Sequence, residues 1–186
     1  MSAPDLSRTR LMVPRILWGA LVFSTCLLFG VALFLLRAGS IPDEPAEPFM
    51  LPALGVVSLV VAIVSVVLPR HMHRKSLELA KLEVLTEVDE RGGAALFRDA
   101  APTIRVFAKP DAARRAAFAR YFTPFILGMS LSESIALWGF TLVVMGEPLL
   151  HALPFWVVCW SLMIPRFPTL KRVYGPLERA HDAILM

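Results

Sequence analysis

Residues 49–68 read FMLPALGVVSLVVAIVSVVL, a run of twenty residues without a single charge. A membrane-spanning helix needs about 20 consecutive, mostly apolar residues, because the hydrocarbon core of a bilayer is roughly 30 Å thick. The whole chain fits this setting, since 56% of its 186 residues are hydrophobic and its mean hydropathy is +0.64. Soluble domains are less apolar, at roughly 45–50% with glycine included. The stretch therefore predicts a transmembrane helix.

Three more apolar runs accompany it. Residues 11–36 carry one charge, Arg15, and residues 121–145 carry one, Glu133. The fourth run, 149–164, is short, and it reaches span length only when its flanks help and Arg166 extends outward to the interface. A re-entrant helix is the alternative for this run. We expect an all-α integral membrane protein with four transmembrane helices. The expected parts are two spans within 1–68, a loop at 69–120, a transmembrane hairpin at 121–167 and a tail at 168–186.

Basic residues predict the orientation, because Lys and Arg in short loops mark the cytoplasmic side. Of the 19 basic residues, 18 precede the first run or lie near its start, lie in 69–120 or follow the fourth run, and Arg37 alone lies on the other side. We therefore expect both termini and the long loop in the cytoplasm, in a bacterial inner membrane. The formal net charge of +4 suits anionic lipid head groups. No nucleic-acid motif appears, so we expect the lipid bilayer and no nucleic acid as a partner.

The long loop contains signals for secondary structure. Leu77, Leu82, Leu85 and Val88 fall near helical spacing, which predicts an amphipathic helix over 71–88 that ends at Gly92-Gly93. A short strand is expected at 103–107. A second helix is expected to start after Pro110 and to run without a break into the third span. In the tail, residues 177–186 are expected to form a short helix on the membrane surface.

Glu133 is the residue with the strongest claim to chemistry. It lies about midway along the run 121–145, where a carboxylate costs at least roughly 2.5–3.5 kcal/mol on insertion scales. We expect no Lys or Arg in a span core to balance it, so desolvation favours the neutral, protonated carboxyl. That form donates one hydrogen bond. Four candidate ligands for a shared ion-binding site lie near Glu133 on the expected hairpin: Ser130 one turn earlier, the adjacent Ser134, Ser161 at the same level, and Trp160 beside it.

The segment Ile126-Leu-Gly-Met-Ser-Leu-Ser-Glu133-Ser-Ile-Ala-Leu-Trp138-Gly resembles the ion-carrying helix of the ring (c, or proteolipid) subunit of rotary ATP synthases. The resemblance implies that Glu133 binds a proton or cation, with Ser134 as a further ligand. It covers about 14 residues of the chain. The glycine-rich helix of that family is missing, and the chain contains no Gln to complete a sodium site.

Two functions stay open on this sequence. In the first, the protein handles protons or cations through Glu133. In the second, it is a non-catalytic scaffold or assembly factor that binds a partner through the loop, and Glu133 only packs between helices. Both readings suit a homo-oligomer or a larger membrane complex. No catalytic, phosphate-binding or zinc motif appears, so we expect no catalytic residue, no metal and no cofactor.

Overall fold

The computed structural model describes residues 3–41, 47–79, 82–88 and 103–185. Two compact units make up the chain. We call Met1–Met72 with Thr123–Pro168 the membrane unit, and His73–Phe122 with Thr169–Met186 the hairpin unit. The elements follow the chain in this order: α1 (Ala3–Arg37), α2 (Met50–Glu78), β1 (Val84–Val88), β2 (Thr103–Phe107), α3 (Pro110–Val144), α4 (Leu149–Met163), the 3-10 turn η2 (Ile164–Arg166) and α5 (Leu170–His181).

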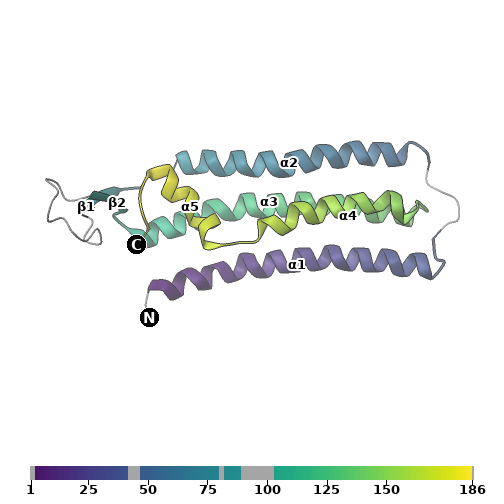
Figure 1. The fold of residues 1–186 in the computed structure, drawn as a ribbon, viewed down its shortest axis with the longest axis horizontal. Coiled ribbons are helices and arrows are strands. Elements are labelled where there is room, and N and C mark those ends of the chain that lie inside the picture. Colours follow the sequence, from purple (N-terminus) through teal and green to yellow (C-terminus); the bar gives the residue numbers. More distant parts are fainter. Residues whose placement is uncertain (1–2, 42–46, 80–81, 89–102, 186) are drawn as a thin grey trace, which may run out of the picture. The chain divides into compact units, whose positions relative to one another are not determined.

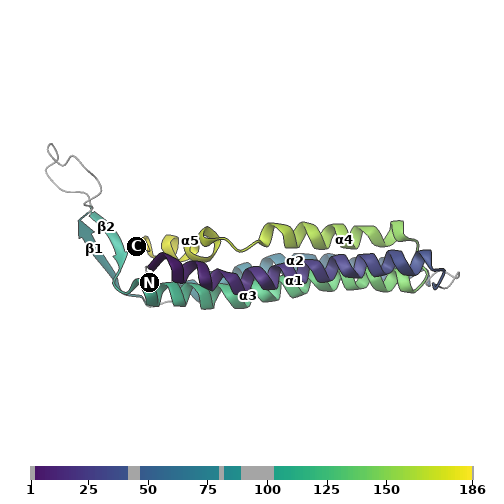
Figure 2. The same ribbon diagram turned by 90° about the horizontal axis from the view of Figure 1, so that it is seen from below.

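The membrane unit confirms the expected all-helical fold with four spans. Four helices of the described chain are long and apolar enough to cross a bilayer. Within the unit, each helix runs in the opposite direction to the one before it (Figures 1 and 2), and α3 and α4 lie between α1 and α2 in the view of Figure 1. Their outer faces are apolar, with Phe23 and Phe34 each 68% exposed and Val56 64% exposed. A soluble monomer rarely exposes so large an apolar surface, so these faces meet lipid.

The third and fourth spans pack closely where α3 has a glycine. A Cβ atom at Gly139 would lie 2.8 Å from Cβ of Phe155 and 3.3 Å from the carbonyl oxygen of Ala152. Small residues let helix backbones approach closely in membranes, where packing rather than water expulsion drives association. The fourth span uses the 18 residues Leu149–Arg166, with its last turn tightened into η2. The hairpin expected from sequence is therefore present.

The hairpin unit corrects the prediction of a single amphipathic helix over 71–88. Helix α2 ends at Glu78, and Val84–Val88 forms a strand that pairs antiparallel with Thr103–Phe107. Both segments are rich in β-branched residues, and cross-strand pairing outweighs the helical spacing of the leucines. The strand expected at 103–107 is confirmed. The expected helix end at Gly92-Gly93 lies outside the described residues.

The two remaining helices agree with the sequence to different degrees. Helix α3 runs from Pro110 to Val144 without a break, as expected. The tail helix was expected at 177–186, and this placement is wrong. Helix α5 begins after Thr169, whose side chain accepts a hydrogen bond from the backbone N–H of Arg172, and it ends where Asp182 adopts a left-handed conformation. Beyond it, Ile184 donates its N–H to the carbonyl of Arg105 on β2.

Candidate functional site

A cation lies inside the membrane unit. The guanidinium group of Arg166, on η2, donates through Nη1 to the carbonyl oxygen of Gly128 and to Oγ of Ser132 at 2.6 Å. Through Nη2 it donates to the carbonyl oxygen of Ser65 at 2.6 Å and to Oγ of the same residue at 3.3 Å. The prediction that Arg166 extends outward is therefore wrong. Its planar fork instead ties η2 to α2 and α3.

Local sequence explains why the Ser65 carbonyl accepts this bond. In an α-helix the carbonyl of residue 65 accepts from the N–H of residue 69. Residue 69 is a proline inside α2, and proline has no N–H to donate. The carbonyl that Pro69 leaves free is the one that Arg166 binds. A buried carbonyl without a donor costs about 1–3 kcal/mol, so the arginine offsets a defect built into α2.

A glycine makes room for the guanidinium group on α3. A Cβ atom at Gly128 would lie 3.3 Å from Cζ of Arg166 and 3.3 Å from Cγ of Pro69. Such contacts are too tight to form without movement of the neighbours. The hydroxyl of Ser132 also donates to the Gly128 carbonyl, at 2.9 Å, so this oxygen is shared by two donors. Gly128, Ser132, Ser65 and Pro69 together form the arginine pocket, the name used below for this cluster.

Among the described residues, no hydrogen bond joins the Glu133 carboxylate to Arg166. Oε1 of Glu133 accepts a hydrogen bond from Oγ of Ser24 on α1, at 2.8 Å, and the Glu133 side chain is half-buried. Among the described residues no ion pair involves Glu133, although the neighbouring residue Ser132 binds Arg166. The guanidinium of Arg166 thus reaches Ser132, the residue before Glu133, without pairing with the Glu133 carboxylate among the described residues.

The four other residues singled out from the sequence take different positions. Ser130 and Ser161 are exposed. The hydroxyl of Ser134 donates within its own helix, to the carbonyl of Leu131 at 2.8 Å. The indole of Trp160 donates to Oγ1 of Thr25 on α1 at 3.1 Å. The structure therefore brings Ser24, rather than any of these four, to the Glu133 carboxyl.

The reason is which face of each helix is buried. The inward face of α4 carries Trp156, Cys159 and Met163, and Ser161 lies outside this stripe. The expected pairing of α3 with α4 agrees with the structure, because Gly139 lies against Phe155. This pairing gives the depth of a side chain along the helix axis, but it does not give the side of the helix from which the side chain points. Sequence reasoning missed Ser24, although the polar pair Ser24-Thr25 in the middle of an apolar run was a visible signal.

Further polar contacts lie at both ends of the unit. The Trp18 indole donates to the carbonyl of Met163 at 2.9 Å, and Nε of Arg15 donates to the carbonyl of Pro168 at 3.3 Å. In the turn before α4, Glu147 is buried and its Oε2 lies 3.0 Å from Nδ1 of His151. Most of these bonds link elements distant in sequence, and they hold α1 to the α4–η2 end of the chain.

These features define a class of protein. Four apolar spans with lipid-facing surfaces and an interior joined by polar contacts make this a polytopic helical membrane protein. Among the described residues no group of His, Cys, Asp and Glu is arranged to hold a metal ion. Comparison of the chain with family models, with curated proteins and with solved structures finds no match.

Proposed function

We propose that this protein is a non-catalytic membrane scaffold whose four spans hold the hairpin unit on the cytoplasmic side, where it binds a partner. The observation that carries this proposal is that the guanidinium group of Arg166 spends its hydrogen bonds on joining helices. An ionisable group inside a membrane is by default a candidate for function, yet both terminal nitrogens of this guanidinium bind α2 and α3. The polar interior is thus occupied with joining helices.

The hairpin unit offers a surface to a partner. Leu85 on β1 is 52% exposed. Beside β1 lies a hollow lined by Leu82, Glu83, Phe107, Lys109, Ala112 and Ala113. Hollows lined by apolar side chains and a few polar groups are a common feature of binding sites.

Affinity capture from native membranes tests the scaffold. Leu85→Glu should reduce the amount of co-purified partner by about tenfold or more, because it places a charge in the contact. Glu133→Gln should leave capture unchanged, and Lys75→Glu, an exposed change on α2, serves as the surface-charge control. Capture that survives Leu85→Glu and is lost in Glu133→Gln would contradict the scaffold.

A second candidate function, proton or cation handling at Glu133, has one observation in its favour. Ser24 binds only Oε1, and among the described residues Oε2 accepts no hydrogen bond, so a proton or cation could reside there. A hydrophobic carbodiimide, which reacts with protonated carboxyls, should then label Glu133 in membranes and fail to label Glu133→Gln. Absence of label in the folded wild type would count against this function.

The ring-subunit resemblance belongs to this second candidate, whereas the expected oligomer suits both candidates. A carboxyl-bearing helix in a rotor acts beside other copies of itself and a stator. Capture from native membranes should then recover rotary ATPase subunits together with this chain. Their consistent absence, with the chain intact and abundant, would separate this protein from that family.

A further inference from the structure

The small sheet of the hairpin unit has one covered edge and one open edge. Strand β1 pairs antiparallel with β2. On the far side of β2, Ile184 donates its N–H to the carbonyl oxygen of Arg105 and forms a parallel bridge with Val106. Figure 2 shows β2 on the side toward the C-terminus and β1 outside it. Within the described part of the chain, no backbone hydrogen bond covers the outer edge of β1.

The register shows which backbone groups of β1 point to the open edge. Ala108 donates its N–H to the carbonyl of Glu83, and hydrogen-bonded pairs alternate along an antiparallel ladder from there. The same alternation places the carbonyl of Arg105 on the outer side of β2, which agrees with the bond from Ile184. In β1, three alternate residues therefore turn their N–H and C=O groups away from β2: Val84, Thr86 and Val88.

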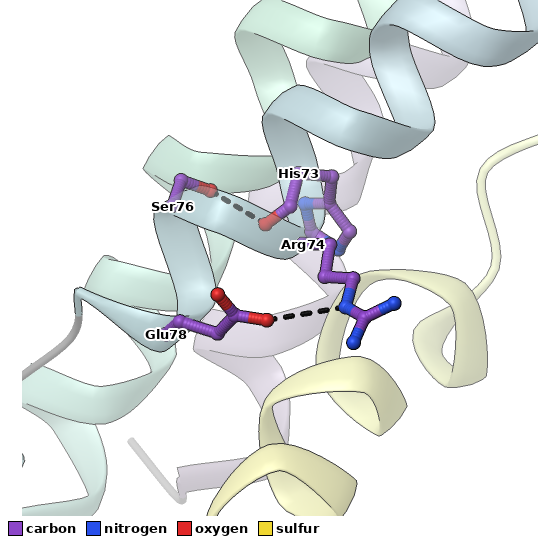
Figure 3. A network of polar contacts seen from close by, with 4 residues as sticks. All are labelled: His73, Arg74, Ser76 and Glu78. Carbon is purple, nitrogen blue, oxygen red and sulfur yellow. Dashed lines mark hydrogen bonds and ion pairs between the residues drawn. The ribbon is translucent and has the colours of Figure 1, made fainter.

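The helix ends beside the strands hold them in place. The last turn of α2 is fixed by a bond from Oγ of Ser76 to the carbonyl of His73, at 2.8 Å, and by the Arg74–Glu78 pair at 3.1 Å (Figure 3). Nδ1 of His73 donates to the carbonyl of Arg120 on α3, at 3.2 Å, and Nε of Arg120 donates to the carbonyl of Ser76, at 2.8 Å. Because α2 leads into β1 and β2 leads into α3, the open strand is pre-organised and loses little freedom when it pairs.

The composition of β1 does not protect its edge. Natural edge strands avoid pairing with other chains through Lys or Pro residues, β-bulges or a covering segment. Strand β1 reads Val-Leu-Thr-Glu-Val, without Lys or Pro, and its register with β2 runs without a bulge. Its β-branched residues favour pairing, and both Leu85 and Thr86 are exposed. Such an edge is a template for a further strand.

The sequence of β1 is complementary to itself in an antiparallel arrangement. With a two-fold axis at Thr86, Thr86 pairs with Thr86 of a second copy, and Val84 pairs with Val88. The outward backbone groups lie at these same residues, so the two strands form about six hydrogen bonds. Glu87 falls opposite Leu85, and no like charges are paired. The open edge therefore fits a second copy of this chain.

We propose that the protein forms a homodimer in which the β1 strands of two copies pair antiparallel about Thr86, giving a continuous sheet in the order β2-β1-β1-β2. A two-fold contact of this kind closes on itself and leaves no further β1 edge. The spans anchor both copies in one bilayer, which keeps their effective concentration high enough for a short strand. The dimer needs no other protein, so it is independent of whether the hairpin unit also binds a partner.

Disulfide formation between copies tests the pairing. The purified full chain, with Cys26 and Cys159 changed to serine, is reconstituted in lipid vesicles and oxidised. Thr86→Cys should form a dimer, because a hydrogen-bonded antiparallel pair has a Cα separation of about 5.5 Å, within the range of disulfides. Glu83→Cys is the matched control at another exposed position. Its two copies lie about 20 Å apart in this register, so its dimer yield should be about tenfold lower or less.

Proline at the open edge tests the dimer without a disulfide. Thr86→Pro removes an N–H that points away from β2, so it should keep the β1–β2 ladder and abolish energy transfer between labelled copies in vesicles. Thr86→Val keeps the N–H and should retain the transfer. Protection of the Leu85 amide against hydrogen exchange reports that the hairpin is intact.

Two outcomes would overturn the proposal. The first is equal disulfide yield at positions 83 and 86. The second is energy transfer that persists in Thr86→Pro while the Leu85 amide stays protected. Where Thr86→Pro also exposes the Leu85 amide, the cysteine comparison decides. In native membranes, a Thr86→Cys product with the mass of this chain plus a different protein, and none with twice the mass of this chain, would assign the edge to that protein instead.

Discussion

The guanidinium group of Arg166 donates to the carbonyl oxygen of Ser65, the carbonyl that the following proline leaves without a helical donor. The two residues are 101 positions apart in the chain. A proline that would weaken an isolated helix thus creates the acceptor that anchors the fourth span to the second. The same logic recurs in α3, where Nδ1 of His73 donates to the carbonyl of Arg120, which stands four residues before Pro124.

Arg166→Met should destabilise the membrane unit by about 1–3 kcal/mol, because methionine fills part of the arginine pocket but leaves the Ser65 carbonyl without a donor. Thermal unfolding in detergent micelles measures the loss. Arg15→Met is the matched control. Arg15 is exposed, and its guanidinium makes one long hydrogen bond, to Pro168, and a cation–π contact with the Phe167 ring at 5.6 Å, so its cost should stay within about 1 kcal/mol. Equal costs for the two variants would contradict the assigned role.

Pro69→Ala should reduce the penalty of Arg166→Met by about 1 kcal/mol, because alanine has the backbone N–H that proline lacks and can satisfy the Ser65 carbonyl. A double-mutant cycle measures this coupling. Pro52 also lies in α2, but in its first turn, where no helical donor is lost. Pro52→Ala and Arg166→Met should therefore be additive within about 0.5 kcal/mol. Additivity in the Pro69 cycle as well would show that the proline and the arginine act separately.

Gly139→Ala and Gly128→Ala should each destabilise the membrane unit by about 1–3 kcal/mol, since overpacked helix contacts must shift to admit a methyl group. The new Cβ would meet Phe155 in one case and Arg166 in the other. Gly30→Ala is the control, because nothing lies within 4 Å of its added Cβ. It should be neutral or stabilising by about 0.5–1 kcal/mol. The unfolding midpoints of the three variants test this. Equal midpoints for all three would contradict the close packing at Gly139 and Gly128.

Ser24→Ala should cost about 0.6 kcal/mol, the average for a hydrogen bond between transmembrane helices, because Glu133 loses the donor on α1. Ser134→Ala removes a hydroxyl that bonds only within α3, and it should have a smaller effect. Glu133→Gln keeps an acceptor for Ser24 and should match the wild type. Chemical unfolding in mixed micelles gives all three values. A larger loss for Ser134→Ala than for Ser24→Ala would reverse the assignment.

Thiol labelling tests the cytoplasmic placement of both termini. In a background where Cys26 and Cys159 are serine, Ser40→Cys should react with a membrane-impermeant reagent on intact cells. Leu170→Cys, at an exposed position on α5, should react only after the membrane is opened. The expectation follows from the distribution of basic residues. The opposite labelling pattern would invert the proposed orientation.

Hydrophobicity along the chain determined a large part of the architecture. Lipid requires long apolar helices with satisfied backbones, so runs such as 49–68 fixed the number of spans without knowledge of their partners. The uninterrupted helix from Pro110 into the third span and the strand at 103–107 also followed from local signals. The helical spacing of the leucines gave a wrong prediction at Val84–Val88, because this segment pairs with β2 instead of extending α2.

The sequence by itself therefore determined that the chain is a four-span membrane protein, and that Glu133 lies in the middle of its third span. Only the tertiary structure decided that Arg166 turns inward and that Ser24 binds the carboxyl. The physical reason is that insertion into lipid depends on the composition of each helix alone. The partner of a buried polar group depends on how helices rotate against one another, which small residues such as Gly128 and Gly139 set through packing.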